Sequence, residues 1–312
     1  MHAEPDKHAL SRGHQQDLEV SSRTLCPAFI GIGAQKCATT WIHANLAAHP
    51  DVFVPANKEL DFFSYNYLRG FAWYRQHFAG TSEKVSGEIS PSYLVDPVAA
   101  DRIRAFNPGT RILVALRDPI DRAFSSHVHE VRKGLYPLAN TSFETGLAEN
   151  PMYLEQSRYG HHLQHWFESF ERDQILVVFQ EEIAAATERS LRNIYRFIGV
   201  NDEWLPKAYC ERSHENVGYR SSALRDTLRF LGGTARRFGL HELVVSSKRT
   251  PVVGSLYQMN RRDFRKEVGA MQEDTRLRLI EELADDMRQL ARLLGRDSLP
   301  WRSWHEVTAK SQ

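Results

Sequence analysis

The chain of 312 residues is long enough to bury the core of one large α/β domain, or of one domain with additions. Its 40 Lys and Arg residues nearly balance 39 Asp and Glu, and the resulting net charge of +1 argues against a general nucleic-acid or membrane-surface binder. Three scattered cysteines argue against a disulfide framework and against a zinc site.

The N-terminal segment, residues 1–25, is polar and has no apolar stretch, so we expect neither a signal peptide nor a membrane anchor. We expect this segment to be disordered and the protein to be cytoplasmic. Residues 26–305 are predicted to form a single domain, in which residues 201–270 make an irregular cap or insert.

The first predicted element is a buried strand over residues 28–32, which ends in a glycine turn. Helical spacing begins at about Ala38, so the segment predicts a strand, a turn and a helix N-terminus in succession. Lys36 stands in the turn, and Thr39 and Thr40 add hydroxyls. Unpaired N–H groups, the helix dipole and a lysine together favour an anion. An ordinary βα turn with a surface lysine is the alternative.

This turn differs from the P-loop of ATP-binding proteins. That motif places glycine directly before its lysine and a magnesium-binding hydroxyl directly after it. Here Gln35 precedes Lys36 and Cys37 follows it. The sequence therefore indicates a phosphate-binding loop without the usual magnesium ligand.

A second short strand is predicted over residues 52–54, and two acidic residues follow it. Glu59 and Asp61 alternate with apolar residues, which we interpret as the end of a strand. Carboxylates at the carboxyl end of a parallel strand face the crevice in which ligands bind. The alternative is a pair of solvated loop charges.

A second candidate anion site follows the most apolar strand of the chain, over residues 111–116. A helix is predicted from Pro119 to about Lys133, with an aspartate before the proline as its start signal. Arg117 lies between strand and helix, and Ser125 lies about two turns into the helix. The alternatives are a salt bridge from Arg117 to a neighbouring aspartate and an exposed helix position for Ser125.

The remaining segments complete an alternating pattern. Residues 134–151 are predicted to be a polar loop, and helical spacing resumes at Tyr153 or Tyr159 and continues to Phe170. Three histidines in that helix favour a partly exposed face over a metal site. The other predicted elements are helices over 71–78, 97–106, 187–198, 223–238 and 273–294 and strands over 85–89 and 175–179. Strands that alternate with helices indicate an α/β fold with a parallel sheet.

Five motifs in order resemble the sulfotransferases that use 3′-phosphoadenosine 5′-phosphosulfate (PAPS), in the branch related to heparan-sulfate sulfotransferases. They are GAQKCATT at 33–40, HPDV at 49–52, ELDFF at 59–63, LRDPIDRAFS at 116–125, and LGRD at 294–297 followed by Trp301. The resemblance implies a P-loop-like parallel sheet with helices on both faces and a single domain.

The resemblance also implies roles for these residues in in-line sulfuryl transfer without a metal. Glu59 would be the base that takes the acceptor proton, and Lys36 would stabilise the leaving phosphate. Arg117 and Ser125 would hold the 3′-phosphate. The residues expected to bind the cofactor are Lys36, Cys37, Ala38, Thr39, Thr40, Trp41, Arg117, Ser125 and, in a segment that could close over the 3′-phosphate, Arg220.

The sequence departs from that branch at several positions. Cys37 and Ala38 replace glycines, and a thiol at a helix N-terminus beside a lysine could have a lowered pKa and react with alkylating agents. Ile89 and Asp61 stand where the branch has basic residues, which argues against a polyanionic acceptor. We therefore expect a hydroxyl or amine of a small molecule, lipid or glycoside from secondary metabolism. Its apolar pocket could be lined by Phe62, Phe63, Tyr65, Trp73 and Tyr93.

Two other functions are compatible with a nucleotide-binding chain. A P-loop kinase of small molecules would need magnesium and a hydroxyl after the lysine. A catalytically inactive nucleotide-binding protein would have no reason to keep all four of Lys36, Glu59, Arg117 and Ser125.

Overall fold

The computed structural model describes residues 26–80, 83–136, 141–210, 217–219 and 261–309. These residues form two compact units. The first consists of the described parts of Met1–Ala123, Met152–Arg212 and Leu277–Gln312, and the second of those of Phe124–Pro151 and Ser213–Arg276. None of the helices in the described ranges is long and apolar enough to cross a bilayer.

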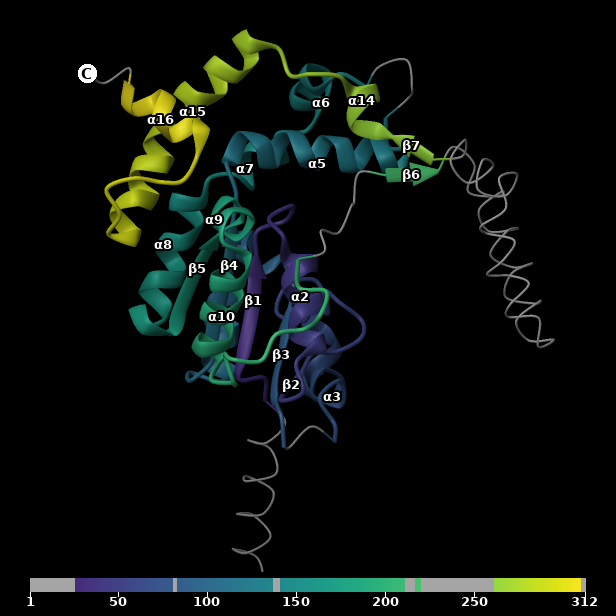
Figure 1. The fold of residues 1–312 in the computed structure, drawn as a ribbon, viewed down its shortest axis with the longest axis vertical. Coiled ribbons are helices and arrows are strands. Elements are labelled where there is room, and N and C mark those ends of the chain that lie inside the picture. The colour runs from purple at the N-terminus through teal and green to yellow at the C-terminus, as the bar shows by residue number, and fades with distance from the viewer. Residues whose placement is uncertain (1–25, 81–82, 137–140, 211–216, 220–260, 310–312) are drawn as a thin grey trace, which may run out of the picture. The chain divides into compact units, whose positions relative to one another are not determined.

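A five-stranded parallel sheet forms the centre of the first unit and confirms the predicted fold class (Figure 1). Its spatial order is β2-β3-β1-β4-β5, and every neighbouring pair is parallel. The strands are β1 (Phe29–Gly33), β2 (Val52–Phe53), β3 (Val85–Ile89), β4 (Arg111–Leu116) and β5 (Ile175–Phe179). Because β1 lies between β3 and β4, the turn after β1 meets the carboxyl ends of both neighbours.

Strands β1 and β4 form where apolar residues run without polar alternation, as expected of strands covered on both faces. All five residues of β1 are buried, as are the last five of β4. Full burial of each aliphatic side chain contributes about 1.5–3 kcal/mol. Gly87 in β3 is required sterically, because a Cβ atom there would lie 2.4 Å from the ring of Phe29.

Helices flank this sheet in the first unit. They include α2 (Thr39–Ala48), α3 (Gly70–Gln76), α4 (Ala99–Phe106), α7 (Met152–Glu155), α8 (Tyr159–Ser169), α9 (Gln180–Ala185), α10 (Thr187–Ile198) and α16 (Arg302–Ala309). Two longer helices, α5 (Pro119–Lys133) and α15 (Glu273–Leu294), belong partly to each unit. The sequence did not predict α9 or α16, both of which follow short connections.

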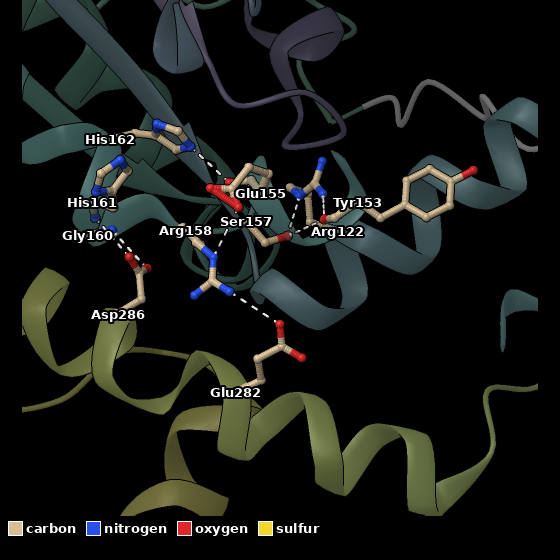
Figure 2. A network of polar contacts seen from close by, with 10 residues as sticks. All are labelled: Arg122, Tyr153, Glu155, Ser157, Arg158, Gly160, His161, His162, Glu282 and Asp286. Carbon is tan, nitrogen blue, oxygen red and sulfur yellow. Dashed lines mark hydrogen bonds and ion pairs between the residues drawn. The ribbon is translucent and has the colours of Figure 1, made fainter. Parts of the chain in front are cut away.

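Helices α8 and α15 are joined by polar contacts that come from distant parts of the sequence (Figure 2). The carboxylate of Asp286 accepts hydrogen bonds from the backbone N–H groups of Gly160 and His161, at 2.9 and 2.8 Å. Arg158, just before α8, pairs with Glu282 at 3.3 Å. A Cβ atom at position 160 would lie 2.4 Å from the carbonyl oxygen of Asp286, so only glycine permits this approach.

The predicted helix ending at Phe170 is interrupted. Residues 156–158 separate α7 from α8, and the hydroxyl of Ser157 explains the break. That hydroxyl lies 2.8 Å from the carbonyl oxygen of Pro119 and 3.0 Å from that of Tyr153, which share its one proton, and it accepts a hydrogen bond from the guanidinium of buried Arg122. These hydrogen bonds, some of which Figure 2 shows, hold the segment between the two helices in place.

The second unit corrects another prediction. Residues 134–151 include the helix α6 (Phe143–Glu149), which begins where the hydroxyl of Ser142 accepts a hydrogen bond from the N–H of Thr145. Phe143 is buried and packs edge-on against Phe124. This unit also contains β6 (Val217–Tyr219), β7 (Arg261–Asp263) and α14 (Phe264–Val268). The expected helix over 223–238, the N-terminal segment and Arg220 lie outside the described residues.

Candidate functional site

The turn between β1 and α2 presents the first predicted anion site. Lys36 and Ala38 both have left-handed backbone conformations, with φ of 65° and 61°. Ala38 is the N-terminal capping residue of α2, no side chain caps the helix, and its first turn contains no acidic residue. The first N–H groups of a helix have no partner inside it, so the dipole and these donors favour an anion here.

Lys58 links this turn to the predicted base. Its ammonium group lies 3.3 Å from the hydroxyl of Thr39, 3.3 Å from that of Thr40 and 2.9 Å from the carboxylate of Glu59. The Glu59 side chain is 46% exposed, so it remains accessible to a molecule from solvent. The structure therefore brings the loop hydroxyls and the Glu59 carboxylate to one ammonium group.

The Glu59–Asp61 segment is not the strand end that the alternation predicted. The strand β2 ends at Phe53, and the two acidic residues lie in an irregular segment with φ of 67° and 49°. The N–H of Glu59 donates to the carbonyl of Ile89 at 3.2 Å, and that of Asp61 donates to the hydroxyl of Ser90 at 2.9 Å. Contacts with the end of β3, rather than strand pairing, hold the segment.

Asp61 is half-buried and accepts a hydrogen bond of 2.6 Å from the hydroxyl of Ser92. Burial raises the pKa of its carboxyl group, while that hydrogen bond lowers it. The charge of Glu59 also raises the pKa of Asp61, as expected of two carboxylates on one segment. This side of the site therefore holds the two carboxyl groups of Glu59 and Asp61 as well as the ammonium group of Lys58.

The second predicted anion site lies at the carboxyl end of β4. Arg117 directly follows the strand and is half-buried, and its charge partly offsets the rise that burial causes in the pKa of the Cys37 thiol. The carboxylate of Asp118 accepts hydrogen bonds from the N–H groups of Ile120 and Ser303, both at 3.0 Å. Asp118 thus stabilises two helix starts. Ser125 lies on α5 within the second unit.

Cys37 is fully buried, which contradicts the expected reactive thiol. Its sulfur lies 3.6 Å from the hydroxyl of Tyr159. Burial raises the pKa of the thiol to about 11, although Tyr159 and nearby arginines act in the opposite direction. A buried, protonated thiol is inert. The sequence indicated only the helix N-terminus and the lysine, whereas burial by distant elements decides the pKa.

The other predicted site residues have clear structural positions. The indole N–H of Trp41 donates to the carbonyl of Tyr209 at 2.7 Å, so the ring of Trp41 is held within the protein. Phe62, Phe63 and Tyr93 are fully buried in the core, whereas Tyr65 is 80% exposed. Three of the aromatic residues expected to line an acceptor pocket therefore belong to the core.

Two contacts of the site were not predicted from the sequence. Lys58 directly precedes Glu59, and this adjacency was a visible signal. Ser90 lies after β3 and reaches Asp61 across 29 positions, so only the fold brings the two together. Combined, the loop N–H groups, Lys36 and Lys58 can bind a polyanionic group, and Glu59 can accept a proton beside it.

Comparisons with known proteins agree with this chemistry. Residues 27–217 match a family model described as sulfotransferase domain. The chain is 32% identical over 190 residues to heparan sulfate glucosamine 3-O-sulfotransferase 3A1 of Mus musculus, covering 59% of this chain and 48% of that protein. It is 31% identical to bifunctional heparan sulfate N-deacetylase/N-sulfotransferase 2 of Homo sapiens, covering 56% of this chain and 22% of that protein.

A solved structure agrees over a larger part of the chain. The sulfotransferase from Alicyclobacillus acidocaldarius superposes with a TM-score of 0.64 at 25% identity, covering 89% of this chain and 99% of that one. By contrast, the chain spans about half, or less, of the length of the two curated relatives above.

Proposed function

The chain belongs to the sulfotransferase domain family, and on that premise we propose that it transfers the sulfuryl group of PAPS to an acceptor hydroxyl or amine. The bond between sulfur and the bridging phosphate oxygen breaks, a bond from sulfur to the acceptor oxygen or nitrogen forms, and the acceptor proton passes to Glu59. PAP leaves. By analogy with phosphoryl transfer, positioning and charge stabilisation supply most of the rate.

The proposed cofactor contacts follow from the turn after β1. Lys36 and the N–H groups of residues 37–40 bind the 5′-phosphate and stabilise the charge on the leaving oxygen. Thr39 and Thr40 donate hydrogen bonds to phosphate oxygens. Arg117 binds the 3′-phosphate, for which the planar guanidinium is well suited. Cys37 stands where a kinase has its magnesium-binding hydroxyl, so the proposal includes no metal.

One observation carries the proposal: a single ammonium group, that of Lys58, contacts both threonine hydroxyls and the Glu59 carboxylate. These distances support a site in which the proposed phosphate-binding loop and the proposed base lie on the same side. Bound phosphosulfate would offer this ammonium group a stronger anionic partner than a hydroxyl. The Glu59 carboxylate would then lie beside the group to be transferred.

For the acceptor, we propose a small molecule, a lipid or a glycoside without high negative charge. The two acidic side chains, Glu59 and Asp61, make the acceptor side unfavourable for a polyanion. The acceptors in the names of the heparan sulfate enzymes above are those of the relatives and form no part of this proposal. Reaction in the cytoplasm and a role in secondary metabolism remain parts of this proposal.

The test is thermal stabilisation of the purified chain by PAP, compared with adenosine 5′-phosphate and with ATP plus magnesium. At about 100 times its dissociation constant, a ligand adds roughly 2.7 kcal/mol to the free energy of unfolding. We expect PAP alone to raise the melting temperature clearly. Arg117→Ala should abolish the rise, whereas Arg111→Ala, at the opposite end of β4, should retain it.

Stabilisation by ATP with magnesium but not by PAP would contradict the proposal and favour the small-molecule kinase. Stabilisation by PAP without any PAP release from PAPS, with 2-naphthol and octyl glucoside as acceptors, would favour an inactive nucleotide-binding protein.

A further inference from the structure

A buried carboxyl group lies behind the Glu59–Asp61 segment and takes no part in the proposed chemistry. Glu88, in β3, is 2% exposed. Its oxygens accept three hydrogen bonds: from the hydroxyl of Ser90 at 2.6 Å, from that of Tyr93 at 2.7 Å and from that of Tyr74 at 3.0 Å. Burial of a carboxyl group is costly unless such partners compensate it.

Two of these hydroxyls continue to the segment that carries the proposed base. The hydroxyl of Ser90 accepts the N–H of Asp61 at 2.9 Å, and that of Tyr93 accepts the N–H of Phe63 at 3.3 Å. A hydroxyl has one proton to donate. The hydroxyls of Ser90 and Tyr93 each use that proton in a hydrogen bond to Glu88. Their lone pairs therefore accept the backbone N–H groups of Asp61 and Phe63.

The segment needs such support. Glu59 and Asp61 both have positive φ, a conformation that costs a residue with a side chain roughly 1–2 kcal/mol. Backbone strain of this kind persists only when the surroundings impose it. The N–H groups of Asp61 and Phe63 are two points at which the surroundings can do so.

We propose that Glu88 is a positioning residue, which orients Ser90 and Tyr93 so that they hold the Glu59–Asp61 segment with the Glu59 carboxylate towards the phosphate-binding loop. The inference rests on the proposed function, in which Glu59 is the base. It goes beyond that function by assigning the base's orientation to a carboxyl group that the acceptor does not touch.

The cluster provides its own matched control. Ser90 and Tyr74 each donate one hydroxyl hydrogen bond to Glu88, but of these two only Ser90 contacts the segment's backbone. Ser90→Ala therefore removes the connection from Glu88 to the N–H of Asp61. Tyr74→Phe removes one hydrogen bond to Glu88 but leaves that connection intact. Glu88→Gln keeps the shape of the side chain, but its NH₂ group cannot accept a hydroxyl proton, so at least one hydroxyl must turn around.

The experiment compares the full-length chain with these three variants by two measurements. The first is amide hydrogen exchange of a peptide that covers residues 57–63. The second is PAP release from PAPS, without acceptor and with 2-naphthol, together with the dissociation constant of PAP.

We expect Ser90→Ala and Glu88→Gln to speed exchange in this peptide and to lower kcat about 10- to 100-fold, with PAP affinity within about twofold. Tyr74→Phe should leave exchange there and kcat near those of the unmodified chain. Equal losses in Ser90→Ala and Tyr74→Phe, or unchanged exchange and kcat in Ser90→Ala, would overturn the inference.

Failure of the proposed function gives a different result. If the unmodified chain neither binds PAP nor releases it from PAPS, the sulfuryl-transfer proposal fails. The exchange measurement then still decides whether Glu88 holds residues 57–63.

Discussion

Backbone strain is concentrated in the candidate site. In the described part of the chain, the residues other than glycine with positive φ are Lys36, Ala38, Glu59 and Asp61. They fall in two segments, the proposed phosphate-binding turn and the proposed base segment. Such conformations cluster at functional sites because the fold must supply the free energy that holds them. The strain therefore supports the site independently of the sequence motifs.

Glu88 gives a prediction about stability and pH. Burial raises the pKa of its carboxyl group from 4.5 to about 7, while hydrogen bonds from Ser90, Tyr93 and Tyr74 lower it and the charge of Asp61 raises it further. Between these two pH values the unfolded chain has released a proton that the folded chain still binds. Its contribution to stability is therefore greatest below pH 4.5 and falls as the pH rises through about 7.

The measurement is urea unfolding of the unmodified chain and of Glu88→Gln between pH 5 and 8. The unmodified chain should lose more stability over this range, by up to about 1.4 kcal/mol per pH unit between pH 5 and 7. Parallel curves for the two proteins would contradict the raised pKa.

At the scale of elements, single carboxylates connect helix starts to distant helices. Asp118 accepts N–H groups at the starts of both α5 and α16. Asp286, within α15, does the same for the start of α8. In both cases one carboxylate joins two helices that are far apart in the sequence. These carboxylates satisfy donors that a helix cannot satisfy internally.

Asp286→Ala should destabilise the chain by about 1–2 kcal/mol, because two N–H groups at the start of α8 lose their acceptor. Asp285→Ala is the matched control. Its side chain is 98% exposed and pairs with Arg288 on the same helix, so the loss should stay below about 0.5 kcal/mol. Equal changes in urea midpoint for the two variants would refute the capping role of Asp286.

At the scale of the whole molecule, the near-zero net charge bears on the acceptor. A chain with 40 basic and 39 acidic side chains has no bulk field to attract a sulfated polysaccharide. Ile89 and the acidic pair Glu59 and Asp61 add no positive charge beside the site. We therefore propose that the chain shares sulfuryl transfer with the heparan sulfate enzymes but acts on a different class of acceptor.

We expect the chain to elute from heparin-agarose at or below about 0.15 M salt, an ionic strength at which exposed charges are screened beyond about 8 Å. It should not transfer sulfate to N-sulfated heparosan at a rate above that to water. Retention at higher salt together with sulfation of that polymer would contradict a neutral acceptor.

The sequence by itself determined the parallel sheet and the β1–α2 and β4–α5 turns. Apolar runs and turn signals are local, and the strand over residues 111–116 and the helix over 119–133 were predicted with the bounds that the structure has. The candidate anion sites were proposed from the same local signals, since a lysine or arginine between a strand and a helix is visible in the sequence. The capped helix α6 was missed because Gly134, Pro137 and Asn140, at the start of residues 134–151, are typical of a loop.

Only the tertiary structure decided the surroundings of the reactive groups. Burial by distant parts of the chain raises the pKa of the Cys37 thiol, whereas the helix N-terminus and the lysine of its own segment predicted a lowered pKa. Lys58 contacts a loop 18 residues earlier, and Glu88 reaches Asp61 only through Ser90. The physical reason is that desolvation and hydrogen bonding depend on which distant groups lie within a few ångströms, whereas helix and strand signals depend on neighbours in the chain.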